Sequence, residues 1–271
     1  MIYQIQTFFF ICLIVVFTTS QGYVLAENKP TGLQQRILDG LTTTIFKHAY
    51  LVSIRKRFSE ISAYEHYCSG SIYSANIILT TASCVRNTNP SNIKVITGTS
   101  YSSGAAQDGA MHTVREVALH TNDSIDIALL HLGTNITLNG FNTKAISLAK
   151  ELPKTGKMGV VAGWGKNTEI GTISENLREI NVPTMDQAAC KAYYFWHSIT
   201  DTEVCAGYVN GGVDACQGDA GSPLLVDGKV IGIVSWGYGC GRKYNPGVYT
   251  NVVRLVDWIE QNAAVTNEIL M

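Results

Sequence analysis

From residue 37 onward, the chain is built of short apolar runs separated by turn residues. Clear examples are the runs 76–81, 93–98, 158–164 and 229–234. Short runs bounded by Gly, Asn and Asp are typical of β-strands. The 25 glycines and the 15% of charged residues are typical of a globular chain with many turns, not of a disordered one. The pattern therefore predicts an all-β fold of the barrel or sandwich class.

One segment near the C-terminus has a helical period instead. Its apolar residues recur at positions i, i+3, i+4 and i+7, namely Val252, Leu255, Val256 and Ile259. This spacing places the four side chains on one face of a helix. We therefore expect a helix over 251–262 that packs this face onto the body of the protein.

The N-terminus carries the pattern of a targeting signal. An uninterrupted apolar run of ten residues, 8–17, is followed by small and polar residues. A membrane-spanning helix needs about 20 apolar residues, so this run predicts a signal peptide over 1–26. Cleavage after Ser20, Gly22 or Ala26 fits the sequence equally well. The mature protein is therefore expected to be secreted and extracellular.

The next stretch, 27–36, is polar and ends in a single basic residue, Arg36. It fits either a short propeptide or a flexible N-terminal tail. Removal of 1–36 changes the formal charge from −1 to −2, through the loss of Glu27, Lys29 and Arg36. A nearly neutral chain gives no reason to expect a nucleic-acid or anionic-membrane partner.

Seven cysteines are present, and Cys12 would leave with the signal peptide. The six that remain form an even set in a secreted chain, which predicts disulfides. The sequence has no Cys-x-x-Cys or His-x-x-x-His pair, so we expect no zinc site and no other metal cofactor.

Two short segments match halves of one catalytic design, and each lacks its reactive group. A Gly-Asp-Ser-Gly-Ser-Pro segment presents a nucleophilic serine beside backbone N–H groups, but in 218–223 the central residue is Ala220. A Thr-Ala-Ala-His-Cys segment supplies a general base, but in 80–84 the histidine position holds Ser83. A serine hydroxyl cannot accept and return a proton near neutral pH as an imidazole does. The two segments therefore predict a protease scaffold without protease chemistry.

Together with five further segments, they resemble the trypsin-like serine proteases of the chymotrypsin fold, from 37 to about 261. The five segments are 36–40, 126–130, 163–165, 235–237 and 246–250. The resemblance implies one peptidase S1-like domain over 37–271, made of two six-stranded antiparallel β-barrels with a boundary near 138–148 and a C-terminal helix. It also implies the disulfides Cys68–Cys84, Cys190–Cys205 and Cys216–Cys240, one of the fifteen pairings that six cysteines permit.

The triad positions of that family fall on Ser83, Asp126 and Ala220, so only the carboxylate survives. An intact triad uses its aspartate to orient the imidazole, and here Asp126 has no imidazole to orient. We expect it to be hydrogen-bonded to the backbone or to Ser83. The neighbouring Ser222 points away from the cleft in the family and is not expected to replace the nucleophile.

Other parts of the family's machinery are present. The backbone N–H groups of Gly218 and Ala220 would form an oxyanion hole, which does not need the serine side chain. The resemblance places Asp214 at the base of a primary specificity pocket, with Ala215 beside it and Gly237 and Gly247 at its walls. That lining suits an Arg or Lys side chain, although a closed or water-filled relic is the open alternative.

The activation machinery of the family is also recognisable. Cleavage after Arg36 would release the Ile37 ammonium, and Asp219 is the carboxylate that it would pair with. On the surface, Asn122 and Asn135 lie in Asn-x-Ser/Thr sequons and are candidate glycosylation sites. The region 97–112 has only one acidic residue, Asp108, so we expect no calcium.

These features favour a secreted, non-catalytic protease homologue that binds a protein as a decoy, an inhibitor or an assembly cofactor. The overall pattern is similar to mite group 3 trypsin-like proteins and to the inactivated protease paralogues of scabies mites, which are associated with interference in host complement. The resemblance thus implies a protein partner, such as a protein of a host defence cascade, and we expect a monomer. An active trypsin-like endopeptidase that cleaves after Arg or Lys is the main alternative, and a lectin-like or storage protein is a third.

Overall fold

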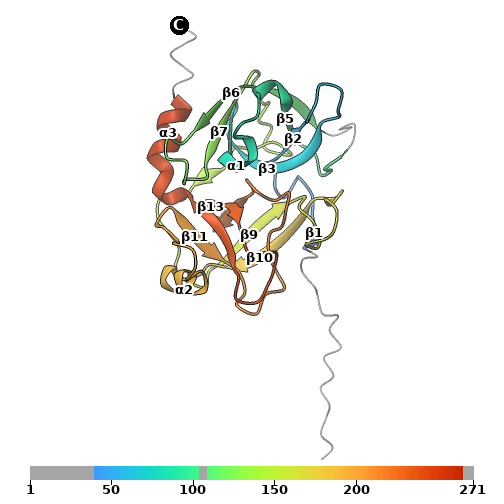
Figure 1. Ribbon diagram of the computed structural model, residues 1–271. Helices are drawn as coiled ribbons and strands as arrows, with labels where there is room; N and C mark the ends of the chain where they lie inside the picture. Colours follow the sequence, from blue (N-terminus) through green and yellow to red (C-terminus); the bar gives the residue numbers. More distant parts are fainter. Residues whose placement is uncertain (1–39, 104–108, 265–271) are drawn as a thin grey trace, which may run out of the picture. The chain divides into compact units, whose positions relative to one another are not determined.

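The computed structural model describes residues 40–103 and 109–264. The predicted signal peptide, propeptide and activation residues Arg36 and Ile37 lie outside this described part. Within it, no helix is both long and apolar enough to cross a membrane. Most of the regular secondary structure in the described chain is β, arranged in two halves, with a helix at the C-terminal end (Figure 1).

The first half is a closed barrel whose hydrogen-bonded order is β2-β3-β4-β7-β6-β5. Its strands are β2 (Leu51–Lys56), β3 (Glu65–Ser74), β4 (Ile77–Thr80), β5 (Ile93–Thr97), β6 (Ala110–Leu119) and β7 (Ala128–Leu132). Side chains such as Ile54, Ile72 and Leu130 fill its interior and are inaccessible to solvent. The prediction of a six-stranded antiparallel barrel is confirmed for this half.

The second half is an eight-stranded sheet, in the order β1-β10-β9-β12-β13-β14-β11 with β8 added in parallel to β13. Its strands are β1 (Leu41–Thr42), β8 (Ser147–Leu148), β9 (Met158–Gly163), β10 (Arg178–Pro183), β11 (Glu203–Ala206), β12 (Pro223–Val226), β13 (Lys229–Trp236) and β14 (Gly247–Asn251).

The expectation of a second six-stranded barrel is therefore corrected. Six longer strands follow the expected path, and two-residue strands are added at β1 and β8. Within the described residues, no strand ladder joins β10 to β11, and an isolated bridge between Thr184 and Ala206 links the chain after β10 to β11. Pro183, the last residue of β10, has no N–H to donate, and its carbonyl accepts from Gly207 N–H at 2.9 Å. The arrangement is consistent with the chymotrypsin-like fold that the resemblance implies.

The two halves share one apolar core. Leu79 and Leu129 of the first half belong to the same buried cluster as Trp164 and Ile233 of the second. Burying large side chains on both sides of the interface stabilises it by roughly 1.5–3 kcal/mol for each fully buried residue. Residues at the edges of the two halves are therefore held at fixed separations.

The four apolar runs form β4, β5, β9 and β13, so these strand predictions are confirmed. Asp227 and Gly228 join β12 to β13 with φ values of 50° and 76°, which suits a tight hairpin turn. The C-terminal helix begins as a 3₁₀ turn, Val252–Leu255, and continues as α3 (Val256–Ala264) beside β7 (Figure 1). Its predicted apolar face is buried at Val252, Leu255 and Ile259.

Two shorter α-helices complete the fold: α1 (Ala82–Val85) and α2 (Gln187–Tyr193). A 3₁₀ turn, Pro90–Asn92, precedes β5. All three disulfide pairings are as predicted: Cys68–Cys84, Cys190–Cys205 and Cys216–Cys240. The first of these ties α1, which carries Ser83, to β3 of the barrel.

Candidate functional site

The three triad positions come together where the halves meet. Ser83 lies on α1, Asp126 directly precedes β7, and Ala220 lies in the turn before β12. The Ser83 hydroxyl donates to Asp126 Oδ2 at 3.0 Å. The Ala220 carbonyl oxygen lies 3.6 Å from Sγ of Cys84, the residue after Ser83. The spacing of the sequence motifs therefore corresponds to one site in space.

Asp126 is fully engaged although it has no imidazole to orient. Its Oδ1 accepts from the Ser83 backbone N–H at 2.7 Å, and its Oδ2 also accepts from the Ser235 hydroxyl at 2.6 Å. Its backbone oxygen accepts from the Thr250 hydroxyl at 2.7 Å. The carboxylate thus acts as a structural acceptor, and the Ser83 hydroxyl that replaces the base is a donor to it.

Ser222 is not placed to act as a nucleophile. It is inaccessible to solvent, and its Oγ has no hydrogen-bond partner within the described chain. That Oγ lies 3.0 Å from the position that a side chain on Gly163 would occupy, so it faces the interior of the second sheet. No hydroxyl near Ala220 points into the cleft from this motif.

The turn that contains Ala220 has a backbone conformation that glycine adopts readily. Gly218 has φ of 101°, which residues with side chains rarely adopt, and a Cβ there would lie 2.6 Å from the Ile173 side chain. Asp219 N–H donates to the Cys216 carbonyl at 2.9 Å. Among residues 40–103 and 109–264, the Gly218 and Ala220 N–H groups have no acceptor. These are the two donors that the resemblance assigns to an oxyanion hole.

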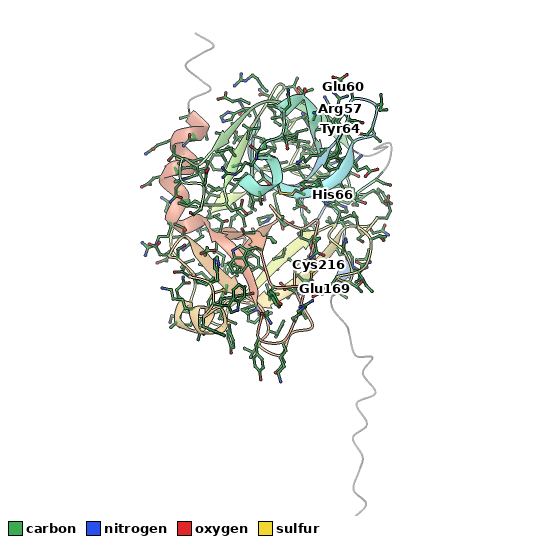
Figure 2. All side chains as sticks on the ribbon, in the orientation of Figure 1. Arg57, Glu60, Tyr64, His66, Glu169 and Cys216 are labelled. Atoms are coloured by element: carbon green, nitrogen blue, oxygen red, sulfur yellow. A yellow bond between two sulfur atoms is a disulfide. The ribbon has the colours of Figure 1, made fainter. Side chains whose placement is uncertain are left out.

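His66 holds the turn that contains Ala220 through a contact with the Gly218 carbonyl. Its Nε2 lies 3.0 Å from the Gly218 carbonyl oxygen, and its Nδ1 lies 2.8 Å from the Ser53 hydroxyl (Figure 2 labels His66). Burial lowers the pKa of His66 to about 4, so at neutral pH the ring is neutral and donates from Nε2. The role of His66 was not predicted, because no local pattern connects it to a residue 152 positions away.

A cavity of about 240 Å³ opens beside Ala220. All four predicted specificity-pocket residues line it, namely Asp214, Ala215, Gly237 and Gly247. The lining also includes Gln217, Trp236 and Tyr249, which were not predicted to belong to it. Pockets for whole drug-sized ligands measure roughly 300–1,000 Å³, so this cavity has the size for one side chain.

Asp214 supplies the charge of this cavity. Its side chain is almost fully buried, and Oδ2 accepts from Gly241 N–H at 3.0 Å. In the described chain Oδ1 has no hydrogen-bond partner, and neither has the nearby Tyr249 hydroxyl. A side chain on Gly247 would approach Oδ1 to 2.7 Å, so this buried oxygen packs directly against the Gly247 backbone. Burial raises the pKa of Asp214 to about 7.

One wall of the cavity is held by an ion pair across two loops. Glu169 and Arg242 form a bidentate pair with both N···O distances at 2.7 Å, and Glu169 Oε1 also accepts from Cys240 N–H at 2.7 Å. Cys240 lines the cavity and is bonded to Cys216 (Figure 2 labels Cys216 and Glu169). This pair was not predicted from the sequence, because its members lie 73 positions apart.

Asp219 has backbone partners in the described chain. Its carboxylate accepts from Gly165 N–H at 2.7 Å and from Cys216 N–H at 2.9 Å. Burial raises its pKa to about 6, and these two hydrogen bonds oppose the rise. Ile37, the expected ammonium partner, lies outside the described residues, so this activation pairing stays a prediction. Asn122 and Asn135 are both exposed, as glycosylation would require.

The charge on Asp214 leads to a prediction for stability. In the folded chain the pKa of the Asp214 carboxyl is raised to about 7. At pH values somewhat below 7, this carboxyl is therefore protonated in the folded chain but ionised in the unfolded chain. Burying Asp214 therefore lowers the free energy of unfolding most above pH 7, where the buried carboxyl is charged. This destabilisation decreases as the pH falls toward 4. We expect Asp214→Asn to be more stable than the natural chain at pH 8, and its advantage to shrink by up to about 1.4 kcal/mol per pH unit below 7.

Urea unfolding of the two proteins at several pH values measures this difference. Comparing the variant with the natural chain cancels opposing contributions, such as that of His66, whose pKa is lowered by burial. A difference that stays constant from pH 8 to pH 5 would contradict a raised pKa at Asp214.

The sequence is similar to known proteins over nearly its whole length. The family model described as Trypsin matches residues 37–259. Trypsin eta of Drosophila erecta is 39% identical over 253 residues, which cover 91% of this chain and 95% of that protein. Trypsin of Simulium vittatum is 40% identical over 223 residues, or 80% and 89% of the two chains. Trypsin zeta of Drosophila melanogaster is 36% identical over 267 residues, or 92% and 94%.

Proposed function

The chain belongs to the trypsin family, and on that premise we propose that it is a secreted member without peptidase activity that acts by binding another protein. Members of this architecture need a nucleophile and a general base in contact at the triad positions. The proposal rests on one observation at those positions. Asp126 is hydrogen-bonded to the Ser83 hydroxyl where the base would stand, and Ala220 has no oxygen where the nucleophile would stand.

The loss of both groups has a large kinetic consequence. Removing triad members from a serine protease leaves only the contribution of substrate binding and oxyanion donors, roughly 10³–10⁴ over the reaction in water. That is about a millionfold below an intact enzyme. The alternative, an active endopeptidase, would need another nucleophile in the cleft, and the buried Ser222 does not supply it.

The binding half of the proposal is supported by the cavity. Asp214 offers an unpartnered carboxylate oxygen, and the Glu169–Arg242 pair holds the loop that carries Cys240. Such a site recognises an exposed Arg or Lys side chain by a charge-assisted hydrogen bond. It could therefore engage the basic loops that trypsin-like enzymes and their inhibitors present, as a decoy, an inhibitor or an assembly cofactor would.

The partner class that we propose is a protein of a host defence cascade such as complement. This step depends on the similarity of the sequence pattern to the inactivated protease paralogues of scabies mites, and that similarity stays a prediction. Binding as a monomer through the cleft is the simplest form of the proposal, because the cavity is complete within one chain.

A turnover assay and a binding assay on the same purified chain test the proposal. We expect no hydrolysis of a fluorogenic arginyl peptide above about one millionth of the rate of trypsin. We also expect saturable binding of a trypsin inhibitor protein that presents a lysine on an exposed loop, and no binding when that lysine is replaced by glutamine. Turnover that scales with protein concentration and disappears in Asp214→Ala would establish the active endopeptidase instead.

A further inference from the structure

A cluster of aromatic rings lies outside the lining of the cavity, and the proposed function does not use it. Two ring pairs join the end of α2 to the loop that follows β13. Tyr193 stacks on Tyr244 with ring centroids 6.1 Å apart, and Trp196 meets Tyr238 at 5.8 Å. We call these four rings the aromatic surface. We propose that it binds an acidic polysaccharide, with sugar rings on the aromatic faces and a sugar carboxylate on a cation of the same loop.

The aromatic surface is open to solvent although its side chains are large. Trp196 is 54% exposed, Tyr238 56% and Tyr244 51%. Large apolar side chains that are exposed singly need no explanation, but a contiguous group of them marks an interaction site. In the segments 193–197 and 238–244 every exposed large apolar side chain is aromatic. The ligand must therefore fit flat rings.

The aromatic surface is held in place from beneath. Tyr194 is inaccessible to solvent, donates its hydroxyl to the Pro246 carbonyl at 2.5 Å, and packs edge-on against Trp196 with ring centroids 5.4 Å apart. On the other loop, Tyr244 N–H donates to the Val209 carbonyl at 2.9 Å. Rings that are already fixed lose little conformational freedom when a ligand binds, which favours affinity.

Two cations lie over rings of this surface. Lys243 Nζ is 4.8 Å from the centroid of the Tyr244 ring, and the Arg242 guanidinium carbon is 5.3 Å from that of Tyr238. Arg242 is paired with Glu169, whereas Lys243 forms no ion pair with any residue of 40–103 or 109–264. The surface thus carries one uncompensated positive charge, and the ligand complementary to it is an anion.

A uronate-containing polysaccharide matches both features. The C–H groups on one face of a pyranose ring are apolar and carry small positive partial charges, so they pack on the negative face of an aromatic ring. The uronate carboxylate accepts a charge-assisted hydrogen bond from a lysine ammonium. Protein interfaces are also enriched in Met, but the segments 193–197 and 238–244 contain neither Met nor any aliphatic side chain larger than Ala. The composition therefore favours a sugar over a protein at this place.

The aromatic surface does not depend on Asp214. None of its four rings lines the cavity. The cavity residue Trp236 lies next to it, with its ring 5.0 Å from that of Tyr194. A polysaccharide bound there would hold the chain on a glycan-coated surface and leave the cavity available for a protein partner. The inference thus goes beyond the proposed function and can fail without it.

Isothermal titration of the mature chain with a hyaluronan octasaccharide tests the inference. Every second sugar of this probe carries a carboxylate, and chitohexaose, built of N-acetylglucosamine alone, is the neutral comparison. At low ionic strength we expect hyaluronan to bind saturably and at least about tenfold more tightly than chitohexaose. Added salt should weaken hyaluronan binding, because exposed charges are screened. Benzamidine, directed to Asp214, should not displace the octasaccharide.

Two variants at exposed positions locate the site. Lys243→Gln removes the charge but keeps the rings, so it should reduce the affinity for hyaluronan to that for chitohexaose. Tyr244→Ala removes a ring and should weaken both sugars by at least about tenfold. Phe58→Ala is the matched control, because it removes a ring that is 75% exposed on the other half of the protein.

The outcomes separate this inference from the proposed function. Absence of binding, equal affinity for the acidic and the neutral sugar, or an equal loss in Phe58→Ala and Tyr244→Ala would overturn the acidic-polysaccharide site and leave the inactive binding protein standing. Displacement of the octasaccharide by benzamidine would place it in the cavity and overturn the inference as well. Tight, salt-sensitive binding that is lost in Lys243→Gln and kept in Phe58→Ala would support it.

Discussion

The double variant Ser83→His/Ala220→Ser is expected to hydrolyse arginyl peptides at least about ten-thousand-fold faster than the natural chain. The two substitutions restore a general base and a nucleophile at positions that the structure already brings together. Asp126 is in place to orient the new imidazole, and Ser235 and Thr250 hold it there. The free N–H groups of Gly218 and Ala220 are available to stabilise the oxyanion.

Position 83 can accept the larger side chain. It is exposed on α1, so an imidazole there extends into solvent and the cleft without displacing core residues. Position 220 is half-buried, and a serine adds only one oxygen to the alanine. We therefore expect the two substitutions to raise the rate of peptide hydrolysis with little loss of folding stability.

The two single variants are the matched controls. Ser83→His has a base without a nucleophile, and Ala220→Ser has a nucleophile without a base. Triad residues act as a unit, so each single change should recover only a small part of the rate of the double variant. The measurement is hydrolysis of a fluorogenic arginyl peptide by the chain that begins at Ile37. A double variant as inactive as the singles would mean that the cleft has lost more than the two side chains.

Much of this site could be predicted from sequence, because its chemistry requires particular residues in particular motifs. The resemblance of the segments 80–84, 126–130 and 218–223 to one family predicted that Ser83, Asp126 and Ala220 share a site, and the structure brings the three together. The specificity-pocket residues were predicted in the same way and line one cavity. In each case a short motif fixes the backbone position of the residue.

The contacts that support the site could not be predicted, because they join residues far apart in sequence that no local pattern marks. His66 meets Gly218 across 152 positions, and Glu169 meets Arg242 across 73. Ser235 belongs to a recognised motif, yet its bond to Asp126 depends on how the two halves pack. Tertiary packing decides such pairs, and sequence periodicity carries no information about them.

The secondary structure likewise contains some elements that were predicted from the sequence and others that were not. Strands with strong apolar runs, such as β9 and β13, were predicted. The helix α2 was not predicted from the sequence. It has seven residues and buries only Cys190, so its buried side chains form no helical period. Asp186 accepts from the N–H groups of Ala188 and Ala189, so an N-cap residue was the one available signal. The two-residue strands β1 and β8 carry no pattern that a sequence can reveal.

The cleft residues that match the family differ in role from the two positions that do not match it. Gly218, with its left-handed backbone, and Gly247, beside Asp214, serve recognition and need no reactive side chain. The groups that were lost, at positions 83 and 220, serve bond cleavage alone. The first set is present and the second is absent, so the proposed binding function predicts that specificity depends on Asp214.

Asp214→Asn is therefore expected to weaken benzamidine binding by at least about a hundredfold. The amidinium of benzamidine would pair with the buried carboxylate, and removing one partner of a buried ion pair costs about 3–5 kcal/mol. The asparagine keeps the shape of the side chain and an oxygen for Gly241 N–H, so the cavity should stay intact. Isothermal titration of both proteins measures the loss, and Asp257→Asn on α3 is a control that removes the same charge from an exposed position.

The pH dependence identifies the group that binds. Because burial raises the pKa of Asp214 to about 7, the cavity of the free protein is increasingly neutral below that pH. The amidinium keeps its charge throughout this range, so affinity should fall by up to about tenfold per pH unit as the pH decreases from 7 to 5. It should level off above 7, and Asp214→Asn should show no such dependence. A variant that binds benzamidine as tightly as the natural chain would place the ligand away from Asp214 and remove the basis for recognition of basic residues.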